Sequence, residues 1–451
     1  MAPRTLIIVE SEGVRQQIQS ATGYPVFATH GHLFRPPQTG ESPAFTASGL
    51  LIARRPIEER AAVLAEMARV LSEGSWDALL IGSDPDDEGD VIAADVAHLA
   101  TTLAPAATLF RITWQTLDSP SVQRSLATAQ PMAPRRNWGA AGLARATIDA
   151  MLSSGLPGVG RVMTPLLAAL ARGADPRTLS LDFHRPWTLR DVLVMDRDRN
   201  VEARYNRAEA LYLNGRLSYP RTAAQAFWPA TCGAIAGATP ILSGETVLPR
   251  QSSLLLPLSA PHEALHATQA AEYAALASIE HDDSVPLDQV SANDALLTAV
   301  QAAALVSLGF LASDEVIEPP APSVSAEAWI VDWQFRERLG RPSTWARRAT
   351  RVAASGWIDR HHPMLGLSRE GQRALARAPA FMRSPDLSRL IEDHIATEAL
   401  RGSSPEAIVA SLQDRLGDLL PEVPQGLRAP ASSAREAEPR KAPVTRLVTP
   451  A

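Results

Sequence analysis

Acidic side chains at the ends of two apolar runs are the first residues in this chain whose spacing could do chemistry. Glu10 closes one run, and Asp84, Asp86 and Glu88 alternate in the turn DPDDEG that follows another. Alternate acids on a turn that enters a helix place three carboxylates around one point, where they repel one another unless a cation lies between them. Because hard oxygen ligands select Mg²⁺, the pattern predicts a magnesium site formed by these four side chains. The alternative is a helix N-terminus that carries acids because the helix dipole favours them.

The elements that must position these acids are predicted within residues 1–125, where strand and helix patterns alternate. Three short apolar runs are typical of buried parallel strands: residues 6–9, 78–82 and 107–113. Residues 56–73 have the apolar spacing of a helix, and Asp118-Ser119-Pro120 is a typical helix start. The pattern predicts a Rossmann-like β/α unit, in which sites lie at the carboxyl ends of the strands.

The rest of the chain has a helical character. Residues 126–330 are alanine-rich and punctuated by Gly and Pro, and residues 330–420 are predicted to form helices with short turns. Residues 421–451 are rich in Pro, Ala, Arg and Ser without apolar periodicity, so we expect a disordered tail there.

Composition limits the class of protein. The 451 residues, 45% hydrophobic and 20% charged, describe an ordinary globular protein with several domains. No stretch approaches the roughly 20 apolar residues that span a bilayer, and the first apolar run breaks at Glu10, so neither a membrane partner nor a signal peptide is expected. The single cysteine, Cys232, excludes a disulfide framework and a zinc finger built on paired cysteines, and it favours a cytoplasmic protein.

The distribution of charge favours a nucleic-acid partner more than the total does. A net charge of −6 argues against such a partner. Lys441 is the only lysine, so nearly all positive charge is arginine, which suits bidentate phosphate contacts but is also what a GC-rich genome produces. Residues 335–351 (FRERLGRPSTWARRATR) contain six arginines and one acid, an imbalance typical of a phosphate-binding surface.

Five motifs together resemble a known family. The start LIIVES, the segment His30-Gly31-His32 and the turn DPDDEGD look like a Toprim domain. The sequence AEALYLNGRLSYPRT at 208–222 is similar to the nucleophile segment of type IA DNA topoisomerases. Three further segments resemble that family's S-A-G-R, H-E-A and G-R-P-S-T motifs: LPGVGRVMTP at 156–165, APHEA at 260–264 and LGRPSTWA at 339–346. All five occur in the family's order.

The resemblance implies a fold and a division into domains. We expect an α/β Toprim (Rossmann-like) N-terminal domain followed by mainly α-helical topoisomerase IA core domains with a shortened β arch. The expected parts are a Toprim domain at 1–125, a helical base domain at 126–180 plus 330–420, an arch or hinge at 181–204 plus 285–329, and a tyrosine gate domain at 205–284. The arch is expected to be short because the intervals from Arg161 to Tyr219 and from Glu263 to Gly340 contain no series of alternating strands.

The resemblance also implies roles for individual residues. Tyr219 would attack DNA and form a 5′-phosphotyrosyl link. Arg221 would neutralise charge on the phosphate, His262 would hydrogen-bond it, and Glu10 would serve as general acid and base for the 3′ oxygen. The implied DNA contacts are Arg161, His32, Arg145, Arg341, Ser343 and Thr344. Trp345 either stacks a base or belongs to the core, and the core is the favoured alternative.

Departures from the family's motifs leave the function less specific than the resemblance suggests. Val14 stands where the family has a lysine, Asp87 replaces an arginine and adds negative charge beside the acids, and His266 replaces another arginine. The leading hypothesis is a monomeric, Mg²⁺-dependent topoisomerase that needs no ATP, acts on single-stranded DNA and lies at a bacterial nucleoid or plasmid. The alternatives are a nicking-and-sealing transesterase without strand passage and a catalytically weak DNA-binding module.

Overall fold

The computed structural model describes two compact parts of the chain. The described residues are 3–36, 45–46, 48–114, 117, 119–132, 137–153, 160–181, 188–195, 200–213, 219–221, 322–359 and 364–420. Unit 1 consists of Met1–Trp114, Asp118–Ser154 and Arg401–Ala451, and unit 2 of Gln115–Leu117 and Gly155–Leu400.

A five-stranded sheet organises unit 1. Its strands, in spatial order, are β2 (Val26–Ala28), β1 (Thr5–Val9), β5 (Ala78–Gly82), β6 (Thr108–Arg111) and β7 (Gln130–Pro131). The first four are parallel, and β7 pairs antiparallel with β6 at the edge. The three predicted strands are confirmed. Because Val9 pairs with Gly82, β1 and β5 end level with each other, and the acids that follow them leave the sheet at the same edge.

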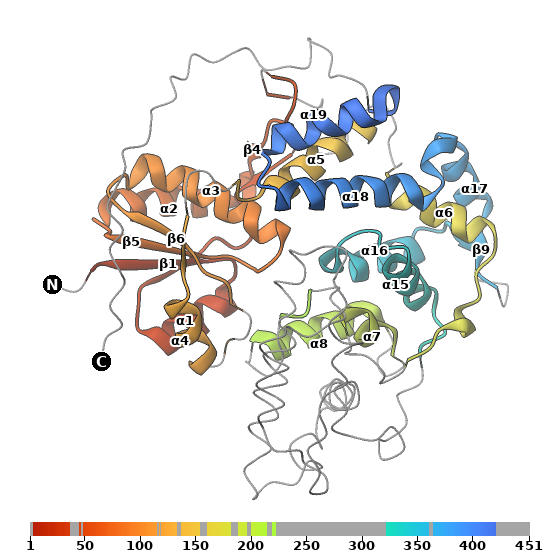
Figure 1. Ribbon diagram of the computed structural model, residues 1–451. Helices are drawn as coiled ribbons and strands as arrows, with labels where there is room; N and C mark the ends of the chain where they lie inside the picture. The colour runs from red at the N-terminus through yellow and green to blue at the C-terminus, as the bar shows by residue number, and fades with distance from the viewer. Residues whose placement is uncertain are drawn as a thin grey trace, which may run out of the picture. The chain divides into compact units, whose positions relative to one another are not determined.

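Helices cover both faces of this sheet (Figure 1). Helices α2 (Ala61–Glu73) and α3 (Asp87–Leu103) lie on one face, and α1 (Glu12–Thr22) and α4 (Ser119–Ala127) lie on the other. The apolar side chains of β1 and β5 are buried, and a core forms between the sheet and α2 and α3. The predicted helix at 56–73 begins later than expected, at Ala61. The residues before it form other elements: Arg55–Pro56 is strand β4, which pairs with β3 (Phe34–Arg35), and Glu58–Arg60 is a 3-10 turn. The remaining helices of the unit are α5 (Ala140–Ser153) and α19 (Pro405–Leu416), with a 3-10 turn at Gly417–Leu419.

Unit 2 is mainly helical in the residues that the structure describes. Its helices are α6 (Met163–Ala171), α7 (Leu189–Val194), α8 (Val201–Leu213), α15 (Ala326–Arg336), α16 (Pro342–Ala354), α17 (Arg369–Ala376) and α18 (Pro385–Leu400). The described residues of this unit also form two 3-10 turns (Pro176–Thr178 and Ala380–Met382) and the strand pair β8 (Ile358–Asp359) and β9 (Gly366–Leu367).

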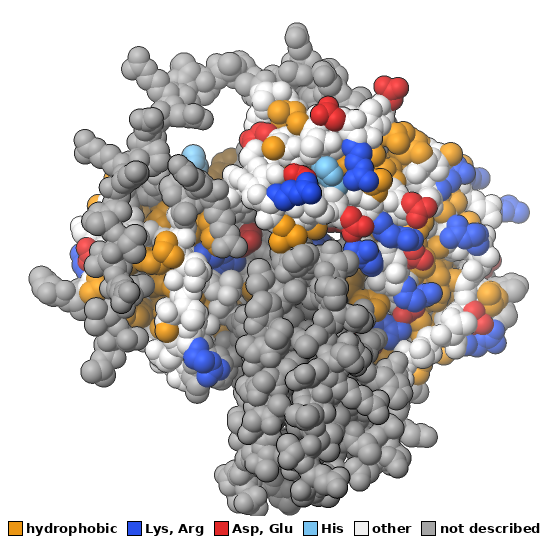
Figure 2. Space-filling view, viewed as in Figure 1, with side chains coloured by type: hydrophobic (Ala, Val, Ile, Leu, Met, Phe, Trp, Pro, Cys, Tyr) orange, Lys and Arg blue, Asp and Glu red, His pale blue; other side chains and the backbone are white. Residues whose placement is uncertain are grey.

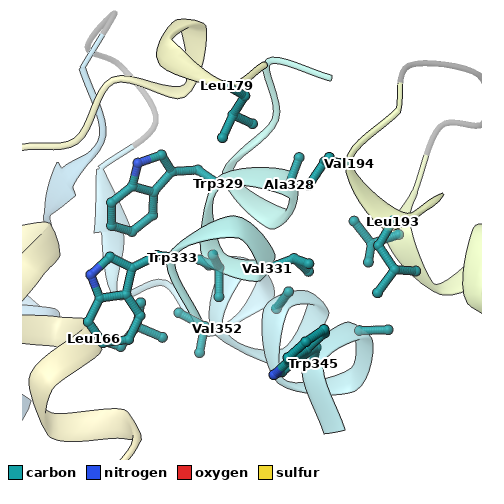
Figure 3. Packing of buried hydrophobic residues seen from close by; sticks show 14 of the residues in the cluster. Leu166, Leu179, Leu193, Val194, Ala328, Trp329, Val331, Trp333, Trp345 and Val352 are labelled. Carbon is teal, nitrogen blue, oxygen red and sulfur yellow. The ribbon is translucent and has the colours of Figure 1, made fainter. Parts of the chain in front are cut away.

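The core of unit 2 is built on α15 and α16 (Figure 3). The rings of Trp329 and Trp333 stack with centroids 6.4 Å apart, and Leu166 of α6 and Leu193 of α7 belong to the same cluster. Trp345 is buried in this cluster, where its Nε1 donates to the carbonyl of Leu339 at 3.2 Å. The interpretation of Trp345 as a core residue is therefore confirmed.

Several predictions about domain organisation stay predictions. Most of the intervals assigned to the arch, including 196–199 and 285–321, lie outside the described residues, as do most of the tyrosine gate domain and the tail at 421–451. Within the described residues, none of the helices has the length and apolar character needed to cross a membrane.

Candidate active site

The acidic turn leads from β5 into α3, and its backbone geometry depends on a glycine. Asp86 is the N-cap of α3, with its Oδ1 accepting from the backbone N–H of Gly89 at 2.8 Å. A Cβ on residue 89 would lie 2.0 Å from the carbonyl oxygen of Asp84, so only glycine fits there. The Ser83 hydroxyl donates to the carbonyl of Gly89 at 2.6 Å and closes the turn from the other side. Asp86 thus performs the helix-capping role that was the alternative to metal binding.

Arg111, which the sequence did not single out, fixes this turn from the neighbouring strand β6. Arg111 is 3% exposed, and its guanidinium donates to the carbonyls of Ser83 at 2.9 Å and Asp84 at 2.8 Å. It also pairs with the carboxylate of Asp90 at 3.0 Å. Burial raises the pKa of the Asp90 carboxyl, and the Arg111 charge opposes that rise only in part. The sequence signal that could have indicated this contact is the position of Arg111 at the end of an apolar strand.

Asp87, expected to add negative charge beside the acids, is neutralised by a partner far away in the sequence. Its carboxylate is 5% exposed and pairs with Nη2 of Arg145 on α5 at 2.7 Å. Asp87 therefore adds no net negative charge beside the acids, because Arg145 supplies the compensating cation. In this structure Arg145, predicted to contact DNA, makes a buried ion pair with Asp87.

The loop after β2 brings a histidine to the first turn of α3. His30 and Gly31 have φ values of +56° and +93°, and this left-handed turn lets Gly31 donate its N–H to the carbonyl of Glu10 at 3.0 Å. His32 then meets Glu88, with its Nε2 2.9 Å from Oε2 of the carboxylate. Desolvation raises the pKa of Glu88, but the hydrogen bond and charge of His32, together with the charge of Arg145, lower it further than burial raises it.

These contacts bear on whether the acids fit a metal ion. Asp84, Asp86 and Glu88 leave one turn, and Glu10 follows the neighbouring strand, so the donors are all carboxylate oxygens, as Mg²⁺ prefers. However, no three Asp, Glu, His or Cys side chains among the described residues are grouped so that they could hold one metal ion. In this arrangement Asp86 caps a helix and Glu88 contacts His32, so an ion could bind the four side chains only if at least one of them left its present contact.

Tyr219 and Arg221 lie together in unit 2. The Tyr219 side chain is 1% exposed, and its ring meets that of Tyr212 edge-on, with centroids 5.5 Å apart. The Arg221 guanidinium carbon lies 5.9 Å from the Tyr219 ring centroid. The predicted nucleophile and the predicted phosphate-binding arginine are thus neighbours, whereas His262 lies outside the described residues.

The other predicted DNA contacts of unit 2 differ in accessibility. Arg161 is 5% exposed, and its Nη2 pairs with Oε1 of Glu392 on α18 at 2.6 Å. Ser343 and Thr344 are half-buried in the first turn of α16, where the Thr344 hydroxyl donates to the carbonyl of Arg341 at 2.9 Å. A helix N-terminus suits phosphate because its N–H groups point outward. Contact of Arg161 with DNA would require Glu392 to release it.

The arginine-rich segment 335–351 is partly neutralised by neighbouring side chains. Arg336 pairs with Asp332 at 2.7 Å, and Arg338 pairs with Asp393 at 2.6 Å. Arg348 donates to Oε1 of Gln334 at 2.5 Å, whereas Arg347 and Arg351 are exposed. On the face shown in Figure 2, acidic side chains lie among the basic ones. Segment 335–351 therefore presents a less concentrated positive charge than its sequence suggests.

Comparison with known proteins identifies the class of the N-terminal domain. Residues 5–113 match the sequence model of the Toprim domain, and this range contains the four parallel strands of the sheet, the acidic turn and the His30–His32 loop. Unit 1 therefore contains a Toprim domain.

Over most of its length the chain has a fold similar to that of a topoisomerase I. It is similar to the structure of full-length topoisomerase I from Thermotoga maritima, with a TM-score of 0.64 and 14% sequence identity, over 92% of this chain and 90% of that one. No match was found among curated proteins. The expected fold, an α/β Toprim domain followed by mainly helical domains, is confirmed.

Proposed function

We propose that this chain is a type IA DNA topoisomerase that cuts and rejoins one DNA strand through Tyr219. The observation that carries the proposal is the pairing of Tyr219 with Arg221 in a chain that also contains a Toprim domain and has the fold of a topoisomerase I. The substrate is single-stranded DNA, and the protein acts as a cytoplasmic monomer without ATP.

The proposed reaction exchanges one phosphate ester for another. The Tyr219 hydroxyl releases its proton to solvent as its oxygen attacks a DNA phosphorus, a bond forms from that oxygen to the 5′ phosphate, and the bond to the 3′ oxygen breaks. Glu10 donates the proton that the 3′ oxygen takes up and accepts it again when the oxygen returns. Arg221 neutralises charge on the phosphorus, and His262 hydrogen-bonds the same phosphate. Because Tyr219 is buried in this structure, attack requires a conformational change that exposes its oxygen.

A single-stranded oligonucleotide tests the reaction directly. With a label on the 3′ side of the cut, denaturation should leave the label attached to the protein, and the other fragment should end in a 3′ hydroxyl. A labelled fragment that is released free, with the protein linked instead to the 3′ phosphate of the other fragment, would contradict the proposal. Binding without any adduct would favour a catalytically weak DNA-binding module.

The proposal includes Mg²⁺, because the acids at the ends of β1 and β5 are oxygen donors of the kind that this ion prefers. Binding would require Asp86 or Glu88 to leave the contacts described above, and no step of the reaction is derived through the ion. We expect plasmid relaxation to fall at least roughly tenfold in EDTA and to return with added Mg²⁺. Relaxation that proceeds normally in EDTA would refute the metal assignment.

A double substitution locates that metal requirement in the acidic turn. Asp84→Asn plus Asp86→Asn should block resealing, and it should leave the fold intact because asparagine also caps helices well. The matched control is Glu58→Gln plus Glu59→Gln, which removes two charges from an exposed 3-10 turn. Equal resealing by the two double variants would show that the acidic turn is not the metal site.

The nicking-and-sealing alternative remains because the predicted arch is short. Strand passage needs an opening wide enough for a duplex, about 20 Å by comparison with groove dimensions. We expect cutting and resealing of an oligonucleotide to be detected at enzyme concentrations at which plasmid relaxation and decatenation are not. Relaxation as fast as oligonucleotide cleavage would contradict the short-arch hypothesis without contradicting Tyr219 as nucleophile.

A further inference from the structure

Two side chains of helix α8 hold the guanidinium of Arg221. The Tyr205 hydroxyl accepts a hydrogen bond from Nε of Arg221 at 2.7 Å, and the Glu209 carboxylate forms an ion pair with Nη2. Residues four apart in a helix lie on the same face, so Tyr205 and Glu209 approach the guanidinium together. We refer to Tyr205 and Glu209 as the arginine clamp.

Helix α8 supports the nucleophile as well as the clamp. The guanidinium carbon of Arg221 lies 5.9 Å from the ring centroids of both Tyr205 and Tyr219, and Tyr212 of the same helix packs edge-on against Tyr219. Val201, Ala208 and Leu211 anchor α8 in the hydrophobic core. One helix that is fixed by its apolar face therefore contacts both members of the Tyr219–Arg221 pair.

The exposure of the clamp argues for positioning rather than for stability. The side chains of Arg221 and Glu209 are 20% and 35% exposed, and ion pairs at such positions contribute little to the free energy of unfolding. Holding a long arginine side chain in one conformation instead favours phosphate binding. An arginine that is already oriented does not lose rotamer freedom when it binds phosphate, and its planar group presents its donors in a fixed direction.

We infer that Tyr205 and Glu209 are positioning residues for the cleavage reaction, which they assist by orienting Arg221 toward the phosphate that Tyr219 attacks. The inference rests on the proposed function. It assigns the clamp no contact with DNA and no proton transfer. It predicts that weakening the clamp slows covalent attack while noncovalent DNA affinity changes little, because misplacing a catalytic group acts on the chemical step.

The test measures the rate of adduct formation on a single-stranded oligonucleotide at saturating DNA. Glu209→Gln keeps the shape and loses the charge, and we expect a roughly tenfold slower rate. Tyr205→Phe loses only the hydroxyl, and we expect a loss of about threefold. Oligonucleotide affinity, measured for each variant in a Tyr219→Phe background, should change less than twofold. The matched control is Glu202→Gln, which removes an exposed acid from the first turn of the same helix.

A double-mutant cycle separates positioning from a merely structural role. In an Arg221→Ala background, whose residual adduct is measured at high enzyme concentration, Glu209→Gln should cause no further loss, because the clamp acts only through Arg221. Losses that multiply would overturn the inference, as would a Glu209→Gln rate equal to or faster than that of the unsubstituted chain. If the unsubstituted chain forms no adduct, the proposed function fails and the inference fails with it.

Discussion

Replacing Tyr219 with phenylalanine is expected to abolish the covalent DNA adduct while leaving the fold and DNA binding intact. The substitution removes one oxygen from a buried ring that packs against Tyr212, so the shape of the side chain is kept. The lost hydroxyl should cost at most about 1.5 kcal/mol of unfolding free energy. Removing a nucleophile should lower adduct formation by at least roughly 10³-fold. Gel analysis of denatured enzyme with a labelled oligonucleotide measures the adduct.

The control for this substitution is Tyr24→Phe, which removes the same atom from a half-buried tyrosine between α1 and β2. The control should form adduct at the rate of the unsubstituted chain. An adduct that persists in Tyr219→Phe would show that another side chain is the nucleophile.

The second large effect is expected at Arg111, whose replacement with methionine should destabilise the Toprim domain by about 3–5 kcal/mol. Methionine leaves the Asp90 carboxylate without its cation and removes donors from the carbonyls of Ser83 and Asp84. Chemical denaturation followed by circular dichroism measures the change. Because this contact also holds the turn that carries Asp84 and Asp86, resealing should weaken under conditions in which the variant remains folded.

Arg69→Met is the matched control, because Arg69 also forms ion pairs, with Glu66 and Glu73, but is about half exposed. Exposed pairs of this kind contribute about 1 kcal/mol or less, so the control should unfold close to the unsubstituted chain. If Arg111→Met loses no more stability than Arg69→Met, the buried network does not hold the turn.

The contacts of the arginine clamp with Arg221 could not be predicted from the sequence. Glu209 lies inside the recognised segment 208–222 and Tyr205 lies three residues before it, but nothing in their spacing shows that both contact Arg221. The segment that contains the proposed nucleophile was identified from its sequence, whereas the roles of Tyr205 and Glu209 beside Arg221 were found only through their contacts.

Local patterns in the sequence determined the strands, the helix that follows β5 and the identity of the acidic turn, because apolar runs and capping residues act over a few positions. They also determined the resemblance that predicted the fold. Only the tertiary structure decided which charges meet. Asp87 pairs with Arg145, 58 positions away, and Glu88 meets His32, 56 positions away. These pairings depend on how the sheet and helices pack, and desolvation at each site then decides whether a carboxylate binds a cation, caps a helix or pairs with an arginine.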